Sequence, residues 1–178
     1  MKQISIVGLG YIGLPTGILA AQKGYKVFGF DINEQKLERI SKGDPTIVEP
    51  EIIQRLYEVL KTNNFQVTYE LQKSDCFIIS VPTPFKIDSK NKQKHADLSF
   101  VFSAADAVAK VLVPGNLVIL ESTVPVGTTS DMAHYLEKKS GLKLGIDFFV
   151  AHCPERVLPG KIFEELVKND RVIGAVCD

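Results

Sequence analysis

The chain has 178 residues, of which 45% are hydrophobic, and its 21 basic residues balance 21 acidic ones. This composition excludes a disordered chain, and the balanced charge argues against a nucleic-acid-binding surface or electrostatic attraction to a membrane. Three scattered cysteines argue against a disulfide framework or a metal site, and neither a signal peptide nor a membrane-length apolar run is present, so we expect a soluble cytoplasmic domain.

Short β-rich runs alternate with helical patterns along the whole chain. We predict strands at residues 4–7, 26–30, 65–68, 76–81, 117–122, 148–151 and 171–176. We predict helices at residues 11–23, 34–42, 51–61, 98–110 and 127–139. Most strand runs are continuously apolar, which is typical of parallel strands covered on both faces. The order predicts an α/β fold of the Rossmann type, with a doubly wound, mainly parallel sheet and helices on both faces.

Local signals mark several ends of these elements. Asn33 and Asp97 stand where N-caps belong, and Gly24 and Gly141 follow the expected ends of helices. The lysine-rich stretch 86–98 fits neither the helical nor the strand pattern of hydrophobic residues. We therefore expect a solvated loop there, with a lid over a site as the alternative.

The motif GLGYIG joins the first strand to the first helix. Gly8 permits a tight turn, Gly10 lets backbone N–H groups approach a pyrophosphate, and Gly13 lets helix and strand pack closely. Asp31, which ends the second strand, can accept hydrogen bonds from a ribose diol and would repel a 2′-phosphate. This order predicts a site for NAD rather than NADP. The alternative is that the glycines only form a turn and Asp31 only caps the next helix.

Polar side chains follow two later strands. Thr83 comes after the strand at 76–81, and Ser122 and Thr123 end the strand at 117–122. Ligands of open parallel sheets bind beyond the carboxyl ends of the strands, so we expect these side chains to face the cofactor crevice. Each alone fits a capping or turn role equally well.

The stretch HCPERVLPG, residues 152–160, places a thiol beside an acid and a base. His152 and Cys153 point to opposite sides of an extended chain, so no catalytic pair is indicated. We expect Cys153 and Cys76 to pack as small buried residues, and Cys177 to lie near the frayed end. For Glu155, the residues by themselves favour an ion pair with a nearby cation.

The longer motifs resemble those of the UDP-glucose/GDP-mannose dehydrogenase family. They are GLGYIGLP, IVEPE, VPTPF, LVILESTVPVGTT, HCPERVLPG and ELVKNDRVIG, and they extend from the first residue almost to the last. The resemblance implies an enzyme that oxidises the C6 alcohol of a nucleotide sugar to a carboxylate with NAD⁺, through a thioester on a cysteine. It is greatest to the branch that oxidises UDP-N-acetyl-D-mannosamine for surface polysaccharide synthesis, and the UDP-glucose branch is the alternative.

The resemblance also implies roles for single residues around the cofactor. The backbone amides of Tyr11 and Ile12 would contact the pyrophosphate, and Asp31 would hold the adenine ribose. Thr83 and Thr123 would line the nicotinamide side.

The resemblance also implies roles for single residues in binding and converting the substrate. Glu155 matches the family's general base toward water, and Thr123 matches the threonine that helps to place that water. Arg156 and Val157 match contacts to the UDP-sugar in the N-acetylmannosamine branch. Pro159 stands where the UDP-glucose branch has a second acid, which favours the N-acetyl sugar.

The same resemblance implies that residues 1–178 are the NAD-binding domain alone. The central dimerisation helix, the UDP-sugar domain and the family's catalytic cysteine and lysine would lie outside it, so we expect the fragment to be inactive. The full-length enzyme is expected to be a homodimer, with a monomer as one possible state of the fragment. A rival interpretation is a stand-alone NAD(H)-sensing module, and other Rossmann dehydrogenases fit the glycines but not CPERVLPG.

Overall fold

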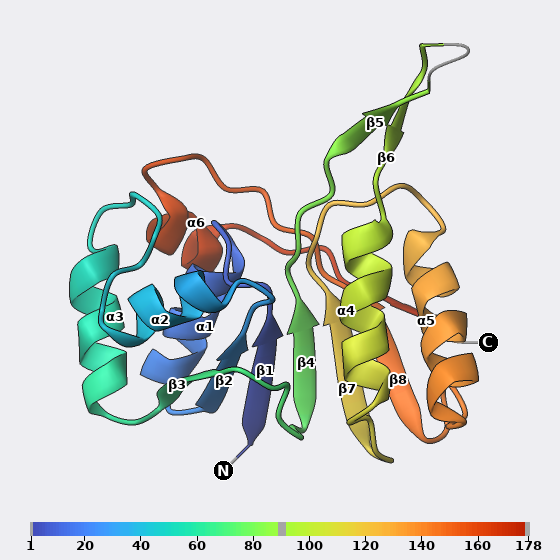
Figure 1. Cartoon of the computed structure of the whole chain (residues 1–178), viewed down its shortest axis with the longest axis horizontal. Coiled ribbons are helices and arrows are strands. Elements are labelled where there is room, and N and C mark those ends of the chain that lie inside the picture. Colours follow the sequence, from blue (N-terminus) through green and yellow to red (C-terminus); the bar gives the residue numbers. More distant parts are fainter. Residues whose placement is uncertain (1, 89–91, 177–178) are drawn as a thin grey trace.

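The protein is described by a computed structural model that covers residues 2–88 and 92–176. Its main sheet has seven strands in the order β3-β2-β1-β4-β7-β8-β9 (Figure 1). The strands are β1 (Gln3–Val7), β2 (Lys26–Phe30), β3 (Phe65–Thr68), β4 (Cys76–Ile79), β7 (Asn116–Leu120), β8 (Phe148–His152) and β9 (Gly174–Val176). All neighbours pair in parallel except β9, which is antiparallel to β8. The predicted doubly wound, mainly parallel sheet is confirmed.

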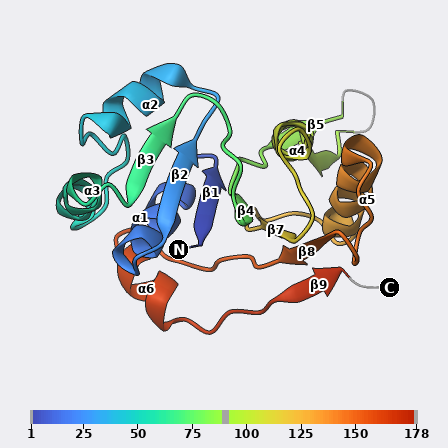
Figure 2. The ribbon, with the colours of Figure 1, turned by 90° about the horizontal axis from the view of Figure 1, so that it is seen from below.

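Helices cover both faces of this sheet. They are α1 (Gly13–Gln22), α2 (Glu34–Ser41), α3 (Ile52–Lys61), α4 (Ser99–Ala109), α5 (Thr128–Ser140) and α6 (Ile162–Lys168). Consecutive residues of β1 point to opposite faces, and Ile6 joins a buried cluster with α1, α2, α3 and α6, whereas Val7 joins one with α4 and α5. Figure 2 shows α4 and α5 on one side of the sheet and α1 and α6 on the other.

The strand order reverses between β1 and β4. The chain leaves β3 at one edge and returns to pair β4 with the other side of β1. The loops that follow β1 and β4 therefore diverge at this point, which leaves a crevice at the carboxyl ends of the two strands. No helix in the described part of the chain is long and apolar enough to cross a membrane.

Several local predictions are confirmed. Asn33 caps α2, because its side chain accepts a hydrogen bond from the Lys36 N–H. Gly141 ends α5 with a φ of 74°, a conformation that glycine adopts without steric cost. Asp97 is one residue earlier than the assigned N-cap of α4, Leu98, yet its side chain accepts the N–H of Ser99.

Three local predictions are wrong. The predicted loop at 86–98 contains most of an antiparallel hairpin of β5 (Phe85–Ile87) and β6 (Lys94–Ala96) that projects from the body, and residues 89–91 lie outside the described part (Figure 1). The predicted strand at 171–176 is shortened to β9, and Arg171 ahead of it forms an ion pair with Glu121. Helix α6 was not predicted, because its seven residues are too few for a periodic pattern.

Candidate functional site

The glycine loop between β1 and α1 contains two glycines that the fold requires. Gly8 has a φ of +99°, and a Cβ there would lie 2.5 Å from the Ser80 carbonyl oxygen. A Cβ on Gly13 would lie only 1.9 Å from the Gly8 carbonyl oxygen. Both residues must therefore be glycine so that the start of α1 can approach β1 and β4.

Gly10 differs from these two glycines. A Cβ built on it meets nothing within 4 Å, and its φ lies outside the left-handed region. Neither backbone strain nor packing within the chain explains why residue 10 is a glycine. The open space lies immediately ahead of α1, where the helix N-terminus favours an anion. This arrangement fits the pyrophosphate cradle predicted from the sequence.

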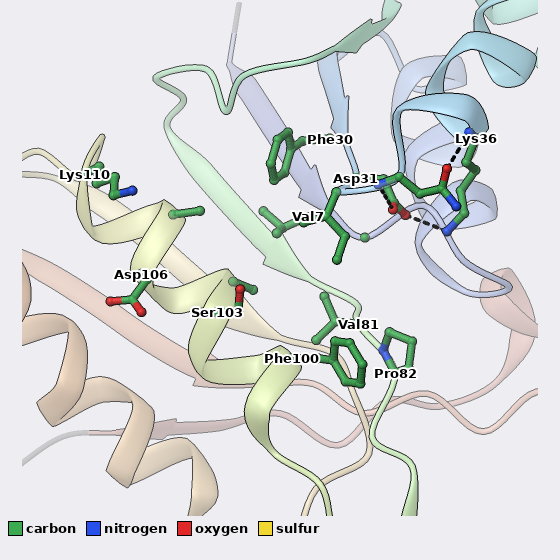
Figure 3. Close-up of a pocket in the computed structure, with 15 residues that line it drawn as sticks. Val7, Phe30, Asp31, Lys36, Val81, Pro82, Phe100, Ser103, Asp106 and Lys110 are labelled. Atoms are coloured by element: carbon green, nitrogen blue, oxygen red, sulfur yellow. Dashed lines mark hydrogen bonds and ion pairs between the residues drawn. The ribbon is translucent and has the colours of Figure 1, made fainter.

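The Asp31 carboxylate lies at the end of β2 and is only 8% exposed. It accepts the Leu9 N–H at 2.9 Å. It also accepts the Asn33 N–H at 3.0 Å and the Lys36 ammonium at 2.7 Å (Figure 3). Because Asn33 is the residue that caps α2, the alternative that Asp31 serves only as that cap is wrong. Lys36 was overlooked in the sequence, although its place one turn into α2 brings it back toward the end of β2.

A cavity of about 440 Å³ opens beside Gly8 and Asp31. Figure 3 shows that it lies between the ends of β1 and β2, the segment after β4, and one face of α4. Its apolar lining includes Val7, Phe30, Val81, Pro82, Phe100, Ala104 and Ala107. An apolar space of this size next to a carboxylate suits the adenosine part of a dinucleotide. The α4 residues were missed because their spacing reads as an ordinary core-facing helix.

The strand-end residues meet, but they do not all face a ligand. The Thr83 hydroxyl donates to the Thr123 carbonyl oxygen at 2.7 Å, which joins the segments after β4 and β7. Ser122 is buried, and its hydroxyl bonds the Val81 N–H at 2.9 Å and the Val81 carbonyl at 2.8 Å. The prediction for Ser122 is therefore wrong, because its hydroxyl is used to hold the two segments together.

The acid and the base of the stretch 154–160, Glu155 and Arg156, lie in different surroundings. Glu155 is half-buried, accepts the Val157 N–H at 2.8 Å, and makes no ion pair with any described residue, contrary to the ion pair that its sequence context favoured. Arg156 is exposed and, with Val157, lines a separate cavity of about 240 Å³ beside Arg171. The hydrogen bonds of the described residues include none between Glu155 and Thr123.

The two described cysteines are Cys76 and Cys153, and the Arg171 guanidinium lies close enough to the Cys153 thiol to interact with it. Cys76 is only half-buried, yet burial, with a contribution from Asp75, raises the pKa of its thiol to about 11. Cys153 is also half-buried, and its backbone N–H donates to the Leu120 carbonyl at 3.0 Å. Cys177 lies outside the described residues. Within the described ranges no group of three or more histidine, cysteine or acidic side chains is placed to hold a metal ion.

Glu121, which directly follows β7, is a buried acid that was not singled out in the sequence. It is 2% exposed and accepts hydrogen bonds from the Thr16 hydroxyl of α1 and, at 2.8 Å, from the Arg171 guanidinium. Burial raises the pKa of Glu121 above its ordinary value, and Arg171 and Thr16 only partly oppose that shift. This ion pair joins the C-terminal segment to the crevice.

Comparison with known proteins agrees with this geometry. The model of the UDP-glucose/GDP-mannose dehydrogenase family, NAD binding domain, matches residues 2–178. A UDP-N-acetyl-D-mannosamine dehydrogenase of Pyrococcus horikoshii is 49% identical over 99% of this chain, and the chain spans 41% of that relative's length.

Solved structures give the same result. The UDP-N-acetyl-mannosamine dehydrogenase of Staphylococcus aureus has a TM-score of 0.92 and 41% identity, covering 99% of this chain and 42% of its own. A UDP-glucose dehydrogenase of Pyrobaculum islandicum has a TM-score of 0.84 and 33% identity, covering 98% of this chain and 41% of its own. The chain therefore belongs to the UDP-glucose/GDP-mannose dehydrogenase family, and it matches that family's NAD-binding domain.

Proposed function

We propose that this chain is the NAD-binding part of a UDP-sugar 6-dehydrogenase whose substrate is UDP-N-acetyl-D-mannosamine. The whole enzyme would oxidise the C6 alcohol to a carboxylate in two NAD-dependent steps. The observation that carries the proposal is the Gly10 cradle, which is open to a ligand and lies beside Asp31 and an apolar cavity. An N-acetylamino sugar rather than glucose is supported by identities of 49% and 41% to N-acetylmannosamine dehydrogenases and 43% to an NDP-N-acetyl-D-galactosaminuronic acid dehydrogenase, against 33% to a UDP-glucose dehydrogenase.

The cofactor would be held mainly by backbone groups and one acid. The amides of Tyr11 and Ile12, ahead of α1, would donate to the pyrophosphate, and Asp31 would accept from the adenine ribose hydroxyls. Thr83 and Thr123 would border the nicotinamide, since they join the segments after β4 and β7. When bound, NAD⁺ supplies the hydride acceptor.

The stretch 154–160 would serve the sugar. Glu155 would take a proton from the water that hydrolyses the thioester, and Thr123 would help to orient that water. Arg156 and Val157 would contact the UDP-sugar, because a guanidinium can bind phosphate oxygens in a bidentate manner. In this proposal Glu155 and Thr123 come together only when the substrate and the rest of the enzyme close the site.

The 178 residues contain neither the glycine-rich cysteine motif nor the lysine-bearing helix of the family. We therefore expect this chain by itself to bind NAD without oxidising a UDP-sugar. We further propose that the complete enzyme is a cytoplasmic homodimer that supplies a uronate for surface polysaccharide synthesis.

Calorimetry on this chain tests the proposal. We expect heat of binding with NAD⁺ or NADH, at least tenfold weaker binding of NADP⁺ because Asp31 repels its 2′-phosphate, and no NADH production from any UDP-sugar. In the complete enzyme, turnover should be faster with UDP-N-acetyl-D-mannosamine than with UDP-glucose. Equal affinity for NAD⁺ and NADP⁺, or turnover by residues 1–178 alone, would contradict the proposal.

A further inference from the structure

One buried carboxylate links the glycine loop to the stretch 154–160. Glu49, in the segment before α3, is 7% exposed. Its Oε1 atom accepts the Tyr11 hydroxyl and, at 2.8 Å, the Gly160 N–H. Its Oε2 atom is buried and has no hydrogen-bond partner among the described residues. We call these three residues, Tyr11, Glu49 and Gly160, the Glu49 bridge.

The Glu49 bridge joins two segments with different tasks. Tyr11 directly follows Gly10 in the loop that would hold the pyrophosphate, and Gly160 ends the stretch that carries Glu155 and Arg156. Glu49 and Gly160 are 111 residues apart in the chain. Both donors bind the same oxygen atom. A displacement of the Tyr11 hydroxyl therefore moves the oxygen that also accepts the Gly160 N–H.

The stretch 154–160 has few other polar links to the body of the protein, although Val157 packs against the buried cluster that contains Ile6. Its remaining hydrogen bonds between described residues stay within 154–169, such as Leu158 N–H to Glu165 at 2.8 Å. Helix α6, which follows it, packs against α1, and Figure 2 shows the two helices together. The Arg55 guanidinium of α3 lies 4.8 Å above the Phe163 ring of α6. The bridge is thus the polar link that ties the end of the stretch to the cofactor side.

We propose that Glu49 is a positioning residue that couples occupation of the glycine loop to the placement of residues 154–160. The carboxylate holds Gly160 in the free protein, and a dinucleotide that fixes Tyr11 fixes Gly160 through the same oxygen. By reciprocity, a substrate held by 154–160 would tighten dinucleotide binding. The inference rests on the proposed function for the identity of the dinucleotide and for the tasks of Glu155 and Arg156.

The first test needs no ligand. Hydrogen exchange of the Gly160 amide is measured by NMR in the wild-type chain and in three variants. Glu49→Ala should speed exchange about tenfold or more, because a hydrogen bond to a charged acceptor is lost. Glu49→Gln should keep exchange close to wild type. The carbonyl oxygen of the glutamine side chain can accept both donors, and its NH₂ group takes the place of Oε2, which has no partner among the described residues. Glu58→Ala, an exposed acid of α3, is the matched control and should change nothing.

The second test adds NAD⁺. In the wild-type chain, amide shifts at Gly10 and Asp31 should be accompanied by a shift at Gly160. Glu49→Ala removes the shared acceptor, so the shifts at Gly10 and Asp31 should persist while the shift at Gly160 is lost. Unchanged Gly160 exchange in folded Glu49→Ala, or a Gly160 shift on addition of NAD⁺ that is equal in Glu49→Ala and wild type, would overturn the proposal. Absence of any NAD⁺-induced shift at Gly10 in wild type would instead contradict the proposed function, and Gly160 exchange would then decide the positioning role.

Discussion

Replacement of Gly10 by alanine separates ligand binding from folding. The added Cβ meets no atom of the protein within 4 Å, and the backbone there is not in the left-handed region. The methyl group would nevertheless occupy the space through which a phosphate must approach the backbone amides ahead of α1. Gly10→Ala should therefore fold normally and bind NAD poorly.

The expected magnitudes follow from the same geometry. Alanine for glycine at an unstrained position changes stability by about 0.4–1 kcal/mol in the favourable direction, because the unfolded chain loses conformational freedom. Loss of hydrogen bonds to a charged phosphate costs roughly 1.5–3 kcal/mol, which is about a tenfold to hundredfold weaker Kd.

Two matched variants complete the comparison. Gly174→Ala, on β9, also meets nothing within 4 Å and should gain the same stability, about 0.4–1 kcal/mol, while leaving NAD affinity unchanged. Gly13→Ala places a Cβ 1.9 Å from the Gly8 carbonyl oxygen and should destabilise the fold by about 1–3 kcal/mol or more. For a chain of this size each kcal/mol lowers Tm by about 2–4 °C.

The assay combines thermal unfolding with calorimetric titration of NAD⁺ for the three variants. The reasoning is refuted if Gly10→Ala binds NAD⁺ as tightly as Gly174→Ala does. It is equally refuted if Gly10→Ala unfolds as early as Gly13→Ala, because the cradle would then be part of the packing.

Further predictions concern single side chains. Asp31→Ala should weaken NAD⁺ binding by about 1–3 kcal/mol in a calorimetric titration, whereas Asp44→Ala, at an exposed ion pair, should not. Because burial raises the pKa of Glu121, the folded state binds its proton more tightly than the unfolded state does, so this group's contribution to stability is largest below pH 4.5 and falls as the pH rises. Urea titrations should thus show the stability of wild type relative to Glu121→Gln falling as the pH is raised from 4.5, and a constant difference would exclude the effect. The Cys76 thiol, with a pKa of about 11, should resist alkylation at pH 8 in the folded chain and react in urea, as peptide mass mapping would reveal.

Much of this molecule could be predicted from local patterns in its sequence. Short β-rich runs, most of them continuously apolar, identified the six parallel strands, because a strand buried on both faces is apolar whichever strands lie beside it. Gly8 and Asp31 were identified because a tight turn and a ribose-binding acid occur at characteristic places after strands. These features depend on residues within one strand-turn-helix unit, which is why the sequence alone could determine them.

Other features depend on contacts between distant segments. The Glu49 bridge spans 111 residues. Glu121 meets Arg171 because β9 pairs antiparallel with β8, beside β7, so that the residues ahead of β9 lie at the end of the sheet where β7 stops. The wall that α4 contributes to the cavity has the periodicity of an ordinary core-facing helix. Periodicity and turn chemistry report short-range preferences, whereas strand order decides which side chains meet. The sequence therefore determined most of the elements and the glycine loop, and the tertiary structure decided which buried acids, cations and apolar faces surround the site.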